Sequence, residues 1–186
     1  MRIIAGKMKG TKLYTLDGLN TRPTLDRVKE PLFSIINFKL QDSVVLDLFS
    51  GSGALGLEAI SRGAKKAYLC DNSKDAINII NKNIKKTKFE NDVEVIFKSY
   101  EKVLEDFKNT LFDIVFLDPP YKSEFVSTAL KKILNNNLLN ENGIIIIETD
   151  DKEKVLKEIA EIDVSIFDER RYGRVTLLFL CTKERM

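Results

Sequence analysis

The sequence predicts a doubly wound α/β domain, in which a mostly parallel sheet is covered by helices on both faces. From residue 43 onward, short apolar runs alternate with segments whose apolar residues recur at helical spacing. The apolar runs are nearly continuous, as is typical of parallel strands that are buried on both faces. A glycine-rich turn follows the first run, and 186 residues are enough for one domain with a sizeable core.

The expected elements follow from these patterns in chain order. Ser73 is placed as the N-cap of the second helix, in which Ile77, Ile80 and Ile84 share one face. Two strands close to each other at the end of the sequence are expected to pair antiparallel. The expected strands are 44–48, 67–70, 93–97, 114–117, 143–148, 164–167 and 175–181, and the expected helices are 54–62, 73–87, 100–108, 125–134 and 152–162.

The chain contains no histidine, which excludes Ser/His/Asp and Cys/His nucleophile systems and the usual zinc hydrolases. Catalysis here would depend on carboxylates, hydroxyls, backbone groups or a cofactor. Cys70 and Cys181 lie in apolar runs, which favours buried thiols over a disulfide or a metal site. No apolar run approaches the roughly 20 residues of a membrane span, and no signal-peptide pattern is present, so we expect a cytoplasmic protein without membrane contact.

Positive charge is concentrated at the start of the chain. Residues 1–40 carry eight basic and three acidic side chains, a net +5, which leaves −3 on the rest of a chain whose total is +2. A basic segment of this kind suits contact with a phosphate backbone. Lys7, Lys9 and Lys12 are therefore candidate phosphate contacts, although an ordinary solvated face would give the same pattern.

The segment DLFSGSGALG, residues 47–56, predicts a ligand loop after the first strand. In doubly wound sheets, ligands bind beyond the carboxyl ends of the strands. Gly51 and Gly53 allow a tight turn and a close approach of backbone N–H groups to a ligand, and Gly56 allows close packing of the next helix. A plain structural turn is the alternative.

Two acids near this loop bear on the choice of cofactor. Asp71 lies twenty residues after Gly51, at the end of the second expected strand, where a carboxylate suits ribose hydroxyls. Asp47 stands at the head of the loop, where it would repel a pyrophosphate but attract a cation. The pattern therefore favours S-adenosylmethionine over a nicotinamide dinucleotide.

The tetrapeptide DPPY, residues 118–121, directly follows an apolar strand. Methylation of an exocyclic amine requires hydrogen-bond acceptors for both N–H groups, because they draw the nitrogen toward tetrahedral geometry. The Asp118 carboxylate and the Pro119 carbonyl can serve as acceptors, Pro120 adds no competing donor, and Tyr121 can stack on the base. A rigid strand exit is the alternative interpretation.

Taken together, several segments resemble the RsmD family of bacterial 16S rRNA guanine-N2 methyltransferases. These segments are RIIAGKMKGTKL near the start, RPT at 22–24 followed by DRVKE, DLFSGSGALGLEAISRGA at 47–64, DPPY at 118–121 and IIIIETD at 144–150. The likeness covers essentially the whole chain. The glycine loop and DPPY alone would indicate only an amino-methyltransferase, whereas the N-terminal block with RPT makes the match specific.

The resemblance implies the class I methyltransferase fold, a Rossmann-like seven-stranded sheet whose last two strands form the antiparallel edge. It implies one domain over 1–186, with a basic extension of hairpin and helix at 1–40 and the catalytic core at 41–186. The implied substrate is 16S rRNA within an assembled or assembling 30S subunit, and the implied cofactor is S-adenosylmethionine. We also expect a monomer without a metal ion.

Carried over by position, the resemblance assigns three groups of residues. Asp118, Pro119, Pro120 and Tyr121 are the implied catalytic residues. The implied cofactor contacts are Asp47, Phe49, Ser50, Gly51, Ser52, Gly53, Gly56, Asp71, Asn72, Ser99 and Tyr100. The implied RNA contacts are Lys7, Lys9, Lys12, Arg22, Thr24 and Arg27, and Glu30 belongs to the same N-terminal block.

Three alternatives and one local departure stay open from sequence alone. The same chemistry could act on DNA, at adenine N6 or cytosine N4, and a nicotinamide oxidoreductase or a non-catalytic RNA-binding module would fit parts of the pattern. Pro31 follows Glu30 where the family leads us to expect a helix-compatible residue. Because proline is harmless in a first helical turn, we expect the helix to begin near Glu30.

Overall fold

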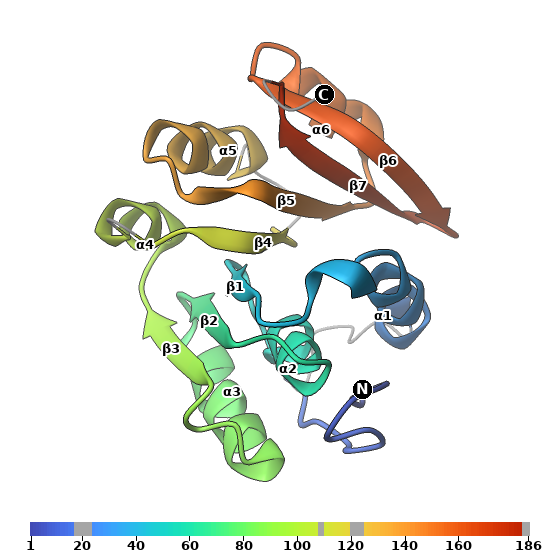
Figure 1. The fold of residues 1–186 in the computed structure, drawn as a ribbon, viewed down its shortest axis with the longest axis vertical. Helices are drawn as coiled ribbons and strands as arrows, with labels where there is room; N and C mark the ends of the chain where they lie inside the picture. The colour runs from blue at the N-terminus through green and yellow to red at the C-terminus, as the bar shows by residue number, and fades with distance from the viewer. Residues whose placement is uncertain (17–23, 108–109, 120–124, 184–186) are drawn as a thin grey trace.

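The computed structural model describes residues 1–16, 24–107, 110–119 and 125–183. Its centre is a seven-stranded sheet in the spatial order β3, β2, β1, β4, β5, β7, β6 (Figure 1). β1 to β5 run parallel, and β7 pairs antiparallel with both β5 and β6. The strands are β1 (Val44–Asp47), β2 (Lys66–Asp71), β3 (Val93–Phe97), β4 (Phe112–Leu117), β5 (Leu139–Thr149), β6 (Val164–Tyr172) and β7 (Val175–Thr182). The expected doubly wound sheet with an antiparallel edge is confirmed.

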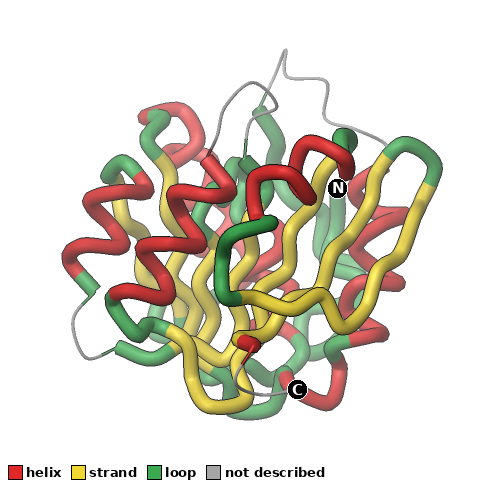
Figure 2. The backbone as a smooth tube through the Cα atoms, turned by 90° about the horizontal axis from the view of Figure 1, so that it is seen from above, coloured by secondary structure: helices red, strands yellow, loops and turns green. Residues whose placement is uncertain are grey.

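Helices cover both faces of the sheet, as Figure 2 shows from above. One apolar cluster packs α1, α2 and α3 against the sheet, and a second packs α4, α5 and α6 against the opposite face. Burial on both faces explains why the strands read as continuous apolar runs. The helices are α1 (Thr24–Ile35), α2 (Ala54–Ser61), α3 (Lys74–Thr87), α4 (Tyr100–Asp106), α5 (Phe125–Asn135) and α6 (Lys152–Ile159), with a 3-10 turn, η1 (Asn37–Lys39), before β1.

The strand order places a topological switch point between β1 and β4. From β1 the chain adds β2 and β3 on one side, and then crosses to add β4 and β5 on the other. The loops that leave β1 and β4 therefore diverge and open a crevice at the carboxyl edge of the sheet, the position where such folds bind ligands. Both the glycine-rich loop and the start of DPPY lie at this edge.

β5 and β6 extend well beyond their expected ranges, and α6 ends at Ile159 rather than near residue 162. β5 begins at Leu139, which pairs with Phe112, before a register shift leads into the apolar run. The sequence did not predict this start, because the polar residues 140–142 interrupt the apolar pattern. β6 extends to Tyr172 through charged residues at the sheet edge, where charge discourages pairing with another sheet.

The expected start of α1 near Glu30 is wrong, because the helix begins at Thr24 and contains Pro31 in its interior. Proline at this position removes one helical hydrogen bond and costs about 3 kcal/mol in an isolated helix. The buried side chains of Val28 and Leu32 hold the helix on the sheet from both sides of the proline. Tertiary packing thus overrides the local preference.

The start of the chain, residues 1–16, forms an arm (dark blue in Figure 1) that lies beside α2. Arg2 and Lys12 form an isolated antiparallel bridge, and backbone hydrogen bonds join Ile3 to Thr11 and Leu13 to Met1. The expected hairpin is therefore present as a very short antiparallel pair. Ile3 and Leu13 are buried in the core, so the arm is a packed part of the protein.

Two further expectations concern cysteines and membranes. Cys70 and Cys181 are both free thiols. Among the described residues, no helix is long and apolar enough to cross a membrane.

Candidate active site

The glycine-rich loop joins β1 to α2 through two residues with left-handed backbone. Gly51 has φ +54° and Gly53, the N-cap of α2, has φ +77°, a conformation that favours glycine at both positions. A Cβ added at Gly51 would meet no atom within 4 Å, which leaves open space above the loop. At Gly56 a Cβ would lie 2.1 Å from the Leu69 side chain, so this glycine allows α2 to pack closely on β2 as expected.

Asp47 at the end of β1 holds this loop by hydrogen bonds. Its Oδ2 accepts a hydrogen bond of 3.2 Å from the Gly56 N–H, and the Ser50 hydroxyl donates to the Asp47 carbonyl at 2.7 Å. Only 2% of the residue is exposed. Burial, together with the negative charges of Asp118 and Asp71, raises the pKa of Asp47 from its ordinary value of 3.8 to about 7. The carboxylate lies where a bound cation would relieve its burial.

Asp71 at the end of β2 connects this strand to the same loop. Its Oδ2 accepts from the Gly51 N–H at 2.9 Å, and its Oδ1 accepts from the Ser73 N–H at 2.8 Å. Each carboxylate oxygen retains a second lone pair, so Asp71 can still receive two hydroxyl hydrogens. Asn72, the next residue, is exposed beside it.

Asp118 follows β4, the strand on the other side of β1. Asp118 and Pro119 are both partly exposed at the carboxyl edge of the sheet. The charge of Asp118 contributes to the raised pKa of Asp47, so these two carboxylates share one electrostatic environment. Pro120 and Tyr121 lie outside the described residues, and their predicted roles stay predictions.

Three aromatic rings gather next to the glycine-rich loop. The ring centroid of Phe49 lies 5.3 Å from that of Tyr100 and 5.9 Å from that of Phe125, and the latter two lie 5.1 Å apart. Burial raises the pKa of Tyr100, and the charge of Glu101 adds to the rise, so the phenol stays neutral. Ser99 is the N-cap residue of α4, directly before Tyr100. The sequence assigned Phe49, Ser99 and Tyr100 to the cofactor site, whereas it placed Phe125 only in a helix.

The candidate RNA contacts are dispersed. Lys7, Lys9 and Lys12 are exposed on the N-terminal arm, and Arg27 is exposed on α1. Thr24 is the first residue of α1, but its side chain lies outside the described part of the structure, as does all of Arg22. The expected positive arm is thus present as an exposed surface.

Sequence reasoning missed a buried carboxylate that holds this arm. Glu58 on α2 is fully buried, and its oxygens accept from the N–H groups of Ile4 and Ala5 at 2.7 and 3.0 Å. The same carboxylate pairs with Lys29 at 3.0 Å and with Arg62 at 2.7 Å. Glu58 therefore joins the arm, α1 and α2, and the signal for it was an acid inside the apolar helix ALGLEAI.

Asn83 on α3 was also missed, although it interrupts an isoleucine-rich helix. The side chain is fully buried and accepts from the Tyr14 N–H at 2.7 Å. Its Nδ2 donates to the Tyr14 carbonyl at 3.0 Å and to the Ser52 carbonyl at 2.9 Å. One amide thus ties the end of the arm to the glycine-rich loop.

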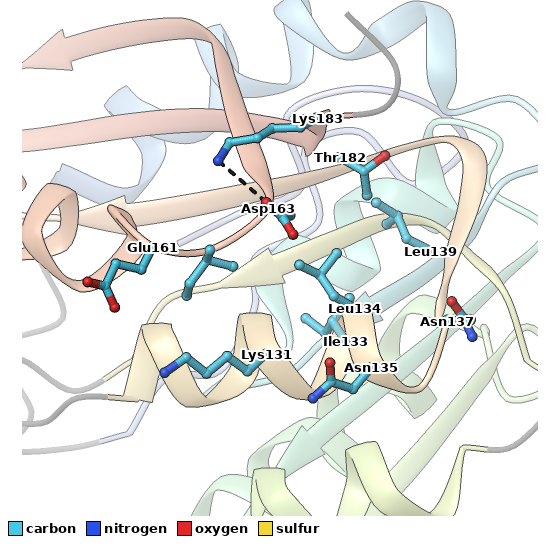
Figure 3. Close-up of a pocket in the computed structure, with 11 residues that line it drawn as sticks. Lys131, Ile133, Leu134, Asn135, Asn137, Leu139, Glu161, Asp163, Thr182 and Lys183 are labelled. Carbon is cyan, nitrogen blue, oxygen red and sulfur yellow. Dashed lines mark ion pairs between the residues drawn. The ribbon is translucent and has the colours of Figure 1, made fainter.

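A pocket of about 560 Å³ lies away from this region, between the end of α5 and the end of β7 (Figure 3). Leu139, at the start of β5, lines it, so the pocket lies at the amino edge of the parallel strands. The candidate residues instead gather at the carboxyl edge. We assign the ligand site to the carboxyl edge, because the carboxylates and the glycine-rich loop that could bind a ligand lie there.

The donor set at the carboxyl edge fits S-adenosylmethionine. Three carboxylates, Asp47, Asp71 and Asp118, would face a ligand that carries positive charge on its sulfonium and ammonium groups. The open space at Gly51 leaves room for a ligand against the loop, although the N–H groups of Gly51 and Gly53 already donate to Asp71 and to the Ser50 carbonyl. Among the described residues, no group of three or more Cys, Asp or Glu side chains has the arrangement of a metal site.

Sequence and structure comparisons place the chain among known methyltransferases. The family model described as "Conserved hypothetical protein 95" matches residues 1–181. Ribosomal RNA small subunit methyltransferase D of Haemophilus influenzae is 41% identical over 158 residues, covering 84% of this chain and 81% of that protein. YlbH of Bacillus subtilis, named as a proposed rRNA methyltransferase, is 35% identical and covers 87% of this chain and 89% of that protein.

A solved structure agrees with these relatives. The proposed methyltransferase yhhF from Escherichia coli superposes with a TM-score of 0.85 at 30% identity, over 98% of each chain. Family model, sequence relatives and solved structure all span most of the chain. This chain therefore belongs to the RsmD family of S-adenosylmethionine-dependent methyltransferases.

Proposed function

We propose that this protein transfers a methyl group from S-adenosylmethionine to the exocyclic N2 amine of a guanine in 16S rRNA, on an assembled or assembling 30S subunit. The observation that carries the proposal is the meeting of Asp47, Asp71 and Asp118 at the carboxyl ends of adjacent strands around a glycine-rich loop. The names of the relatives, which act on ribosomal RNA of the small subunit, support the class of substrate.

The cofactor assignment rests on charge and on the loop. S-adenosylmethionine supplies a methyl group bound to a positively charged sulfonium. A distant solved neighbour of the same fold, a proposed methyltransferase, was crystallised with S-adenosylhomocysteine, the product left after methyl transfer. In this chain Asp71 would accept from the ribose hydroxyls, Asp47 would stabilise the positive end, and Ser99 and Tyr100 would meet the adenine. Phe49, Ser50, Ser52 and Asn72 would complete the contacts.

Asp118 and Pro119 would act on the target amine. The Asp118 carboxylate accepts one N–H of the amine and the Pro119 carbonyl accepts the other, which directs the nitrogen lone pair toward the methyl carbon. The new C–N bond forms as the C–S bond breaks, and one amine proton leaves to Asp118 or to water. None of these steps requires histidine, in agreement with the composition.

The target guanine would have to be unpaired or flipped out of its helix. A stacked and paired amine lies too far from both the methyl donor and Asp118. We further propose that residues 1–40 act as a substrate-binding extension of a core at 41–186, with Lys7, Lys9, Lys12 and Arg27 as phosphate contacts. The exposure of these four side chains supports this assignment.

Radiolabelled methyl transfer tests the proposal with four samples in parallel: unmethylated 30S subunits, naked 16S rRNA, genomic DNA and no nucleic acid. After transfer, the products are digested to nucleosides. Label in N2-methylguanosine from 30S subunits is the expected result. Label in N6-methyladenine or N4-methylcytosine from DNA would refute the proposed rRNA substrate. Label in none of the samples would refute the proposed methyltransferase activity.

A further inference from the structure

We propose that Tyr14 and the neighbouring face of α3, with Lys82 and Lys86, bind a single-stranded segment of the RNA substrate next to the methylation site. We call this area the Tyr14–α3 surface. The inference rests on the proposed function, because it assigns where a strand of that substrate lies.

The first observation is an exposed aromatic ring beside a cation. Tyr14 is 49% exposed although the residue before it, Leu13, is buried in the core. The Lys86 ammonium lies 4.4 Å from the centre of the Tyr14 ring. An accessible ring next to an ammonium is the combination that proteins use for single strands, because bases stack on the ring and phosphates pair with the cation.

The second observation is the charge along α3. Lys82 and Lys86 are four residues apart on a continuous helix, so both project from the same side, and both are exposed. Lys12 is exposed two residues before Tyr14 on the arm. Within the part of the chain that the structure describes, Lys12, Lys82 and Lys86 form no ion pair with a carboxylate, so their charges are available to phosphates.

The third observation connects this surface to the candidate active site. Asn83 holds both backbone groups of Tyr14, and the same side chain holds the carbonyl of Ser52 in the glycine-rich loop. The backbone of Tyr14 is therefore fixed by a buried amide on a regular helix, and little backbone freedom is lost when a base stacks on the ring. A strand on this surface would lie next to the loop that holds the methyl donor.

RNA fits this surface better than an acidic protein segment does. Exposed bases of a single strand offer flat rings to Tyr14, and a strand offers a phosphate at each nucleotide to the lysines. The charge pattern alone would also attract a polyanion that lacks bases. The contribution of the ring separates the two, since only a nucleic acid stacks on it.

The charge test compares two double variants with equal changes of charge. Lys82→Glu with Lys86→Glu alters the Tyr14–α3 surface, whereas Lys131→Glu with Lys157→Glu alters exposed lysines of α5 and α6 on the opposite face of the sheet. We expect the α3 variant to raise KM for 30S subunits and to lower the slope of log affinity against log salt by roughly 1.4 to 1.8. Affinity for S-adenosylmethionine should stay the same in both variants, and the control should resemble wild type.

The ring test uses Tyr14→Ala and Tyr14→Phe. Affinity for a fluorescent single-stranded oligoribonucleotide of mixed sequence should fall roughly 5- to 150-fold with alanine, the range for one lost base stack, and little with phenylalanine. Heparin serves as the anion without bases, and its affinity should not respond to the loss of the ring. Equal losses for the oligoribonucleotide and heparin would identify a general polyanion surface and overturn the proposal.

The outcomes keep this inference apart from the proposed function. Wild-type methylation of 30S subunits together with an unchanged KM in the α3 double variant would refute the Tyr14–α3 surface alone. Absence of methylation by wild type would refute the proposed function, and the oligoribonucleotide would still report on the surface. Circular dichroism of each variant verifies that it folds.

Discussion

Asp47 is almost fully buried, yet its neighbours Asp71 and Asp118 are also acids, and its pKa is raised to about 7. Between about pH 3.8 and 7 the folded protein keeps a proton on Asp47 that the unfolded chain has lost. The contribution of this carboxyl to the free energy of unfolding therefore falls as the pH rises through that window. Such a cost to stability is common where a residue is placed for binding.

This arrangement predicts a pH dependence of cofactor binding. A cationic ligand prefers ionised Asp47, so the affinity for S-adenosylmethionine should rise up to about tenfold per unit as the pH approaches 7, and level off above it. Isothermal titration calorimetry between pH 5.5 and 8.5 measures this dependence. Buffers with different ionisation enthalpies should reveal release of close to one proton on binding below pH 7.

Asp47→Asn provides the control for this prediction. The amide oxygen can still accept from the Gly56 N–H but no longer ionises. We expect a weaker and pH-independent affinity, and a higher free energy of unfolding at pH 8, measured by urea denaturation. The same pH dependence in wild type and Asp47→Asn would assign the titration to another group.

At the scale of elements, Glu58 links three segments that are far apart in the sequence. The carboxylate accepts from the arm, pairs with Lys29 of α1 and pairs with Arg62 just after α2. Lys29 is also fully enclosed, and its ammonium donates to the Arg2 carbonyl at 2.5 Å. Removal of one member of a buried pair leaves an uncompensated charge, which is more damaging than the loss of the contact itself.

Glu58→Ala should therefore lower the free energy of unfolding by about 3 to 5 kcal/mol. The measurement is urea denaturation followed by circular dichroism. Glu105→Ala breaks an ion pair with Lys132 in which Glu105 is 58% exposed, and should cost less than about 1 kcal/mol. Equal losses in the two variants would show that the buried network contributes no more than a surface pair.

The sequence predicted the elements wherever one local signal dominated. The apolar runs located the strands, and Ser73 caps α3 as expected, with its hydroxyl accepting from the Ala76 N–H at 3.4 Å. The start of α1 was wrong because Pro31 is a strong local signal that only packing overrides. The polar start of β5 was missed because its partner, Phe112, lies on a different strand.

The residues of the candidate site also differ in how far the local sequence predicts them. The roles of residues fixed by backbone requirements, such as Gly51 and Gly56, could be predicted from their spacing in the sequence. The contacts of Asn83 and Glu58 join residues at separations of 69 and 54 positions, and no local pattern encodes such partners. The only sequence signal was a polar residue on an apolar helix, which indicates burial but not what it binds.

At the scale of the whole molecule, positive charge lies on the arm, whereas the acids of the site lie at the carboxyl edge of the sheet. The molecule thus separates a surface suited to a polyanion from a crevice suited to a cation. Such a separation lets the substrate backbone and the cofactor be held by opposite charges.

Reversal of Lys7 and Lys9 to glutamate tests the arm. We expect weaker binding of 30S subunits and a flatter dependence on salt, with the slope reduced by roughly 1.4 to 1.8 as two phosphate contacts are lost. Filter binding at several salt concentrations gives the slope. The Lys131 and Lys157 double reversal is the matched control, and an unchanged slope in the arm variant would place the RNA on another face.

The most direct measurement is the single-turnover rate of methyl transfer to 30S subunits by Asp118→Ala, together with its affinity for S-adenosylmethionine at pH 8.5. Because the carboxylate would act on the amine rather than hold the cofactor, we expect the rate to fall by at least about 100-fold while the affinity stays within about threefold. A rate near that of wild type would contradict the role of Asp118 and the mechanism built on it.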